Sequence, residues 1–288
     1  MSIESVWPLG VFASLDAGLG VRWEVIEQLH VPTIQLHAPS PPRCTRQTAA
    51  ELQAQLSRMN VTLTCVFGGF HDESYADIPT VARTVGLVPR ATRAERVAGM
   101  KVIADFAAWL ACDAVGLHLG VVPHRKSDEC EYDAVVSVTR ELCDHVAEHG
   151  QRIHLETGQE TADELLEFIG AVERDNLFIN FDPANMILYG TGEPIEALEK
   201  VGRFVRSVHC KDATWSDQPT KTWGREVPLG EGAVGMRRYL QTLKDLGYRG
   251  PLTIEREIPE QADRQLREIG QATRLLTDLS AELWGQAG

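Results

Sequence analysis

Eight short apolar runs alternate with helical patterns along the whole chain. Each run is rich in β-branched and apolar residues and is bounded by turn-forming residues, which is typical of a buried strand. A strand followed by a helix and then another strand predicts a parallel sheet. The expected strands cover residues 9–13, 33–37, 61–67, 114–118, 153–156, 177–182, 205–209 and 252–255.

The helical patterns have amphipathic spacing and, in several places, capping residues or a terminal glycine. They cover residues 23–30, 45–59, 93–110, 134–149, 162–169, 194–201, 236–246 and 261–283. Eight such units in 288 residues, with no linker between them, predict a single-domain α/β protein over residues 1–288, a (β/α)₈ TIM barrel. A doubly wound open sheet built from the same units is the alternative. Residues 68–91 and 211–235 are expected to be long irregular loops, which usually carry function.

The composition narrows the class of protein and of partner. A net charge of −13 argues against nucleic acid and anionic membranes as partners, because both attract basic surfaces. No segment has the length and apolarity of a membrane span, and residues 1–5 lack the pattern of a signal peptide. The six cysteines form no CxxC pair, which favours reduced thiols and a cytoplasmic location.

Four expected strands in the C-terminal half end in residues that can hold a divalent metal: Glu156, Asp182, His209 and Glu255. Because the carboxyl ends of parallel strands share one rim of a barrel, these residues should meet there. Three carboxylates and one imidazole suit Mn²⁺, Mg²⁺ or Co²⁺, with Zn²⁺ possible. A cation would also remove the mutual repulsion of the carboxylates.

Glu156 and Glu255 stand at the two ends of this arc, so they can flank a substrate held through two adjacent oxygens. A metal that polarises a carbonyl makes the neighbouring C–H acidic. One glutamate can then remove that proton, giving an enediolate, and the other can return a proton, which epimerises or isomerises a sugar. There is no Rossmann glycine pattern and no P-loop, so nothing favours hydride or phosphoryl transfer.

Five stretches resemble a known superfamily: LETGQE at residues 155–160, NFDPANM at 180–186, VHCKD at 208–212, PLGEG at 228–232 and TIERE at 253–257. They are similar to the xylose isomerase-like TIM barrels, and more narrowly to the sugar phosphate isomerase/epimerase branch with tagatose 3-epimerase, inosose dehydratase and hydroxypyruvate isomerase. The resemblance implies the same four metal ligands, with Glu156 and Glu255 as acid and base. It also places His118, Asn185 and Lys211 near the substrate. Endonuclease IV in this superfamily carries extra histidines, whereas this chain has Asn185 at one such position.

Further substrate contacts are expected from loops at the same rim. His71 follows the third strand, Glu160 follows the fifth, and Glu226 lies in the loop after the seventh. Each also has a simpler interpretation. His71 could be a solvated imidazole and Glu226 a surface charge, and Glu160 could be a carboxylate that favours the positive N-terminus of the following helix. The half of the mouth without metal ligands carries Phe12, His37, Phe67, Phe70, His71 and His118, and it would hold the substrate. For Lys211 and Asp212, the simpler interpretation is an ion pair between the two side chains. For His154, it is a hydrogen-bonded position in the core.

The leading hypothesis is a divalent-metal-dependent sugar isomerase or epimerase. A metal-dependent lyase or dehydratase acting on a cyclitol, keto-sugar or glycoside shares the first proton transfer and is the alternative. A non-catalytic sugar-binding barrel is the third hypothesis. The expected partner is a small sugar, sugar acid or cyclitol, and the chain is a possible homodimer.

Overall fold

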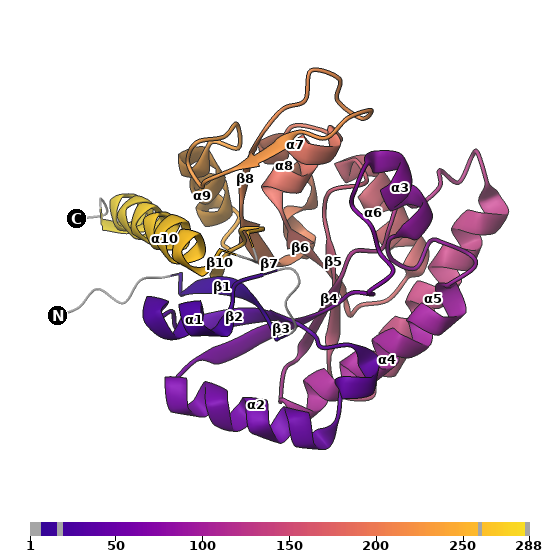
Figure 1. Ribbon diagram of the computed structural model, residues 1–288. Coiled ribbons are helices and arrows are strands. Elements are labelled where there is room, and N and C mark those ends of the chain that lie inside the picture. Colours follow the sequence, from indigo (N-terminus) through magenta and orange to yellow (C-terminus); the bar gives the residue numbers. More distant parts are fainter. Residues whose placement is uncertain (1–6, 16–19, 259–260, 286–288) are drawn as a thin grey trace.

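A computed structural model describes residues 7–15, 20–258 and 261–285. Eight parallel strands close into a barrel in the order β1-β10-β7-β6-β5-β4-β3-β2, with helices around its outside (Figure 1). The prediction of a TIM barrel is therefore confirmed, and the alternative prediction of an open doubly wound sheet is wrong. The barrel strands are β1 (Leu9–Ser14), β2 (Thr33–His37), β3 (Thr62–Gly68), β4 (Ala114–Leu117), β5 (Arg152–Glu156), β6 (Leu177–Phe181), β7 (Val205–Cys210) and β10 (Leu252–Ile254).

The outer helices follow the expected order. They are α1 (Trp23–Leu29), α2 (Arg46–Met59), α4 (Arg93–Trp109), α5 (Glu129–Ala147), α6 (Ala162–Val172), α8 (Pro194–Val201), α9 (Met236–Asp245) and α10 (Ala262–Gly285). Two 3₁₀ turns, Pro41–Arg43 and Gly202–Phe204, add to them. Helix α5 begins at Glu129 rather than at residue 134, because Asp128 caps it by accepting the backbone N–H of Glu131 at 3.0 Å.

Four short elements, two helices and two strands, are not expected from the sequence. Helix α3 (Ile78–Thr84) lies in the first long connection, and the antiparallel pair β8 (Asp212–Thr214) and β9 (Arg225–Val227) lies in the second. Helix α7 (Pro183–Tyr189) follows β6 directly. The prediction that the two long connections are irregular is therefore wrong where α3, β8 and β9 form. The prediction of eight helices is wrong because α3 and α7 are additional. Both extra helices begin with an aspartate cap, Asp77 or Asp182, and have a proline in the first turn.

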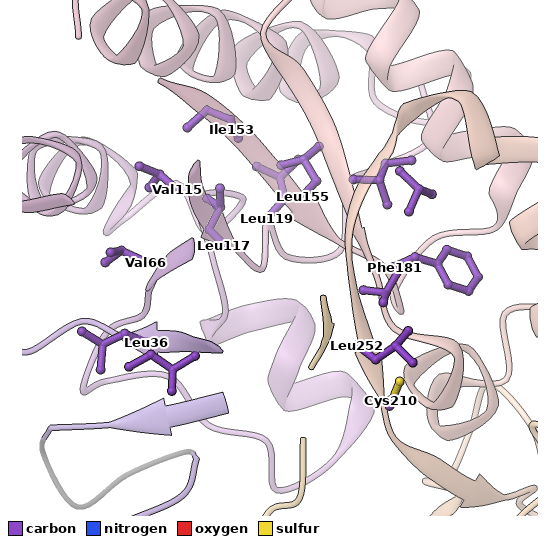
Figure 2. Close-up of a cluster of buried hydrophobic side chains, with 14 of the residues drawn as sticks. Leu36, Val66, Val115, Leu117, Leu119, Ile153, Leu155, Phe181, Cys210 and Leu252 are labelled. Atoms are coloured by element: carbon purple, nitrogen blue, oxygen red, sulfur yellow. The ribbon is translucent and has the colours of Figure 1, made fainter. Parts of the chain in front are cut away.

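The strands alternate between an outer apolar face and an interior that mixes polar side chains with a small apolar cluster of Phe12, Cys65, Phe67 and Ala114. Leu36, Val115, Ile153 and Phe181 belong to the buried layer that packs under the helices, part of which Figure 2 shows. The alternate residues point into the barrel, because successive side chains of a strand face opposite ways. Among these inward residues, Nδ1 of His154 lies 2.8 Å from Oγ of Ser207, so the expected hydrogen-bonded core position of His154 is confirmed.

The described residues contain no helix that combines the length and the apolar character needed to cross a lipid bilayer. All six cysteines are free thiols, and five of them are buried. Burial raises the pKa of Cys112 to about 12, so that thiol stays protonated and acts as a small apolar group.

Two glycines with similar backbone angles offer a test of the close approach between the loops after β3 and β4. Gly86 (φ +72°) would place a Cβ 2.1 Å from the carbonyl oxygen of Leu119, whereas Gly150 (φ +69°) would place it in open space. Both alanine variants cost about 1–2 kcal/mol for the left-handed backbone, and Gly86→Ala should lose about 1–3 kcal/mol more through overpacking. Urea unfolding of the two variants measures the difference, and equal midpoints would contradict the prediction.

Candidate metal and substrate site

Glu156, Asp182, His209 and Glu255 converge at the carboxyl ends of β5, β6, β7 and β10. One ligand atom from each lies within 4.8 Å of the others, and all four residues are buried. Nδ1 of His209 lies 2.6 Å from Oε1 of Glu156, 3.1 Å from Oε2 of Glu255 and 3.5 Å from Oδ2 of Asp182. The structure thus brings together the four residues that the sequence pattern selected, on one rim of the barrel.

The donor atoms of this cluster suit a divalent cation. Oε1 of Glu156, Oδ2 of Asp182 and Nδ1 of His209 are buried without an aligned hydrogen-bond partner in the described part of the chain. Burial alone would lower the pKa of His209, but the carboxylates of Glu255 and Glu156 outweigh it and raise that pKa well above its usual range. A proton on the imidazole and a bound cation are therefore alternative ways to offset the negative charge of the carboxylates.

Asp182 combines two roles. Its Oδ1 accepts the backbone N–H groups of Ala184 at 2.8 Å and of Asn185 at 3.0 Å, which caps helix α7. Its Oδ2 stays free and faces the cluster. The helix cap thus fixes the orientation of the carboxylate, and its second oxygen remains available to a metal.

Glu156 and Glu255 each have one carboxylate oxygen close to a side-chain nitrogen of another residue. Nε2 of His118 lies 2.6 Å from Oε2 of Glu156, and Nζ of Lys211 lies 3.2 Å from Oε2 of Glu255. Burial would raise the pKa of Glu156, but the charges and hydrogen bonds of His118 and His209 hold it well below its usual range. The His118 ring is itself held by Gln159, whose amide nitrogen lies 2.8 Å from Nδ1.

Lys211 is buried among acceptors at the mouth of the barrel. Its Nζ donates to Oε1 of Glu257 at 2.6 Å and lies 3.4 Å from Oδ1 of Asn185. Lys211 and Asn185 therefore stand beside the cluster, where the resemblance places them. The proposed Lys211–Asp212 ion pair is wrong, because the Asp212 carboxylate instead accepts backbone N–H groups, one from the next residue in β8 and three from the loop that follows β9.

Gln35 on β2 is a supporting residue that the sequence analysis missed. Its Oε1 accepts a hydrogen bond from Nε2 of His209 at 2.7 Å, and its amide donates to Oδ1 of Asn180 at 3.2 Å. This bond keeps a proton on Nε2 and turns Nδ1 toward the carboxylates, as the outer partner of a metal-binding histidine does. The sequence feature that could have revealed Gln35 is the presence of a glutamine in the middle of an otherwise apolar strand.

A cavity of about 40 Å³ lies next to the cluster. The expected wall residues Phe12, His37, Phe67 and His118 line it, together with Glu73, Tyr75 and Glu257, which the sequence did not single out. Glu73 holds the loop after β3 by accepting the backbone N–H groups of Phe70 and Gly86.

Three predicted substrate contacts do not line this cavity. His71 is exposed and, like Phe70, lines a separate cavity of about 880 Å³ on the other side of the loop after β3. Glu160 lines a third cavity with His124 and Arg125, and burial raises its pKa to about 8. Glu226 connects β9 to the end of β10, because its carboxylate accepts hydrogen bonds from the Arg256 guanidinium and from the backbone N–H of Glu257.

The family model for the xylose isomerase-like TIM barrel matches residues 24–277. The chain belongs to this family. The fold, the closed order of its strands and the extent of the match confirm the resemblance drawn from the five motifs.

Several individual proteins are similar to this chain. A crystal structure of a xylose isomerase domain protein from Planctomyces limnophilus is 58% identical, covers 96% of this chain and 98% of its own, and superimposes with a TM-score of 0.94. An L-ribulose 3-epimerase from Methylomonas sp. is 28% identical over 61% of this chain and 59% of its own length. A 3-dehydroshikimate dehydratase from Bacillus anthracis is 23% identical over 51% and 57%. The chain thus spans about three fifths of the length of these two curated relatives.

Removal of the Gln35 acceptor should weaken metal binding at the cluster. The variant Gln35→Met keeps the length of the side chain, but it leaves the Nε2 proton of His209 without a partner. We expect the dissociation constant for Mn²⁺ to rise about tenfold to hundredfold, as measured by electron paramagnetic resonance of free Mn²⁺.

Gln151→Met is the matched control. Gln151 is also a buried glutamine, but its amide donates to the carbonyl oxygens of Ala104 and Cys112 near the start of β5. Its loss should lower stability and leave Mn²⁺ affinity unchanged. Equal affinities for Gln35→Met and the unaltered protein would show that Gln35 does not tune the cluster.

Proposed function

We propose that this protein is a divalent-metal-dependent epimerase or isomerase that moves a proton next to the carbonyl group of a sugar. The observation that carries the proposal is the pair Glu156 and Glu255, which approach one shared centre from two sides of His209. The similarity to an L-ribulose 3-epimerase supports the same class of reaction.

The four clustered residues would hold the cation, which when bound polarises the substrate carbonyl and makes the adjacent C–H acidic. Either Glu156 or Glu255 accepts that proton, and the other donates one to the opposite face or to the neighbouring carbon. His118 fixes one oxygen of Glu156, and Lys211 fixes one oxygen of Glu255. These contacts orient the two carboxylates before the substrate arrives, which lowers the cost of reaching the reactive geometry.

The charge around the cavity favours a neutral substrate. Its lining includes the carboxylates of Glu73 and Glu257 in addition to the two catalytic glutamates. The nearby ammonium of Lys211 is already shared between Glu255 and Glu257. A phosphate or carboxylate on the substrate would meet repulsion here, so an unphosphorylated keto-sugar is the substrate class we propose.

Access to the site requires a change in the loops. A cavity of about 40 Å³ holds only a few water molecules, since one water needs about 10–15 Å³. The loop after β3, which supplies Gly69, Glu73 and Tyr75, forms one wall. We propose that this loop moves away from the barrel axis when a sugar enters. The ring of Tyr75 on this loop then packs against the apolar face of the sugar.

A dehydratase is the second candidate, and the similarity to a 3-dehydroshikimate dehydratase favours it. It would begin with the same proton abstraction and end with loss of water. The mass of the product separates the two reactions, because epimerisation and isomerisation leave the mass unchanged.

The test is turnover of a panel of unphosphorylated ketopentoses and ketohexoses in D₂O with Mn²⁺, read by NMR and mass spectrometry. We expect deuterium to enter the carbon next to the carbonyl. The variants Glu156→Gln and Glu255→Gln should each lower kcat by about a thousandfold or more, because they remove an acid–base group. Glu160→Gln, in its separate cavity, should change kcat by less than about threefold.

Two results would contradict this function. Unchanged turnover in both glutamine variants would remove the acid–base pair from the mechanism. Tight sugar binding without any deuterium exchange, with each of several divalent metals, would favour a non-catalytic sugar-binding barrel.

A further inference from the structure

A second group of metal-ligating side chains lies on the outside of the barrel, between α4 and α5. Asp105 belongs to α4, His145 to the last turn of α5, and His149 follows the end of that helix. Nε2 of His145 and Nε2 of His149 lie 2.8 and 3.3 Å from the same atom, Oδ1 of Asp105. Outside the barrel mouth, this is the one such group that the described part of the chain contains.

This group lies far from the catalytic rim. The helices of a TIM barrel run antiparallel to its strands, so the last turns of α4 and α5 lie at the end opposite the active face. His145 is in the last turn of α5, and α4 ends at Trp109, just beyond Asp105. A metal bound here would take no part in the chemistry of the barrel mouth.

The arrangement goes beyond an ordinary ion pair between a histidine and a carboxylate. Such a pair exists at His124 and Glu164, where one imidazole meets one oxygen at 2.9 Å. At Asp105 two imidazoles converge on one oxygen, with ring planes at 80° to each other and centroids 6.0 Å apart. His149 lies two residues beyond the end of α5, yet its imidazole reaches the same carboxylate oxygen as that of His145. Three donor atoms thus surround one point.

The seam between the two helices keeps these donors close together. One turn earlier on the same helices, Nζ of Lys101 donates to Oε1 of Glu141 at 2.6 Å. The side chains of His145, Asp105 and His149 are 22%, 36% and 41% exposed. Water therefore has access to complete the coordination of an ion, while the ligands are held by the packed helices.

We propose that Asp105, His145 and His149 bind one Zn²⁺ ion that joins α4 to α5. Two imidazole nitrogens and one carboxylate oxygen leave the fourth tetrahedral position to water. Ligands about 2.0–2.1 Å from zinc stand roughly 3.3 Å apart, close to the two N–O distances observed. Imidazole-rich sites suit zinc, whereas the three carboxylates of the barrel mouth suit harder ions. The chain thus offers two sites with different metal preferences.

The experiment compares zinc content across single variants of the whole protein. Each protein is dialysed to equilibrium against micromolar free Zn²⁺, and bound zinc per chain is measured by inductively coupled plasma mass spectrometry. We expect His149→Gln and Asp105→Asn each to hold one zinc ion fewer than the unaltered protein. His124→Gln, the matched control with a single histidine–carboxylate pair, should hold the same amount as the unaltered protein.

Thermal unfolding provides the second measurement. Zn²⁺ should raise the melting temperature of the unaltered protein more than that of His149→Gln, because an ion that binds only the folded state stabilises it. The proposal is overturned if His149→Gln and Asp105→Asn hold as much zinc as the unaltered protein. It is also overturned if His124→Gln loses as much zinc as they do, since that result means nonspecific binding to surface histidines.

Discussion

The structure depends on how three buried carboxylates are kept together. Glu156, Asp182 and Glu255 lie within a few ångströms of one another with little access to water, an arrangement that is unstable unless a positive charge stands among them. The imidazole of His209 occupies that position, at the end of the strand between β6 and β10. Because the closed barrel fixes the order of these strands, it also fixes which donors meet.

A layer of hydrogen bonds inside the barrel extends from this cluster. Gln35 connects His209 to Asn180, and His154 connects to Ser207 one layer deeper. The helices contribute as well, since the hydroxyl of Tyr239 on α9 donates to the carbonyl oxygen of His209 at 3.1 Å. These interior hydrogen bonds therefore restrict the orientation of the cluster, while the apolar outer face of the same strands packs against the helices.

The fold and the four clustered residues followed from local pattern alone. Alternating strands and helices predict a parallel sheet, eight such units favour a closed barrel, and residues at the carboxyl ends of parallel strands share one rim. Gln35 was not found because its partner His209 is distant in sequence, and nothing in an apolar strand indicates which inward residue will face an imidazole. Helix α7 does not stand out in the sequence because Asp182, a ligand candidate at the end of a strand, is also the residue that caps this helix through one of its carboxylate oxygens.

Loop residues were harder to place than residues at strand ends. Glu160 and His71 follow strands closely, but the packing of their loops turns them into other cavities. The partner of Lys211 was misassigned for the same reason, because the neighbouring Asp212 is saturated by backbone groups of its own loop. Such orientations depend on tertiary contacts that the local pattern does not contain.

The carboxylate of Asp212 has a consequence for how this barrel can diversify. It accepts the backbone N–H groups of Ala213, Gly230, Gly232 and Val234, so both ends of the intervening segment are fastened to one point directly after Lys211. Insertions or exchanges within residues 215–223 can therefore alter the outer contour of the mouth while Lys211 and its acceptors keep their positions. This anchoring leaves the shape of the segment free to vary without moving Lys211.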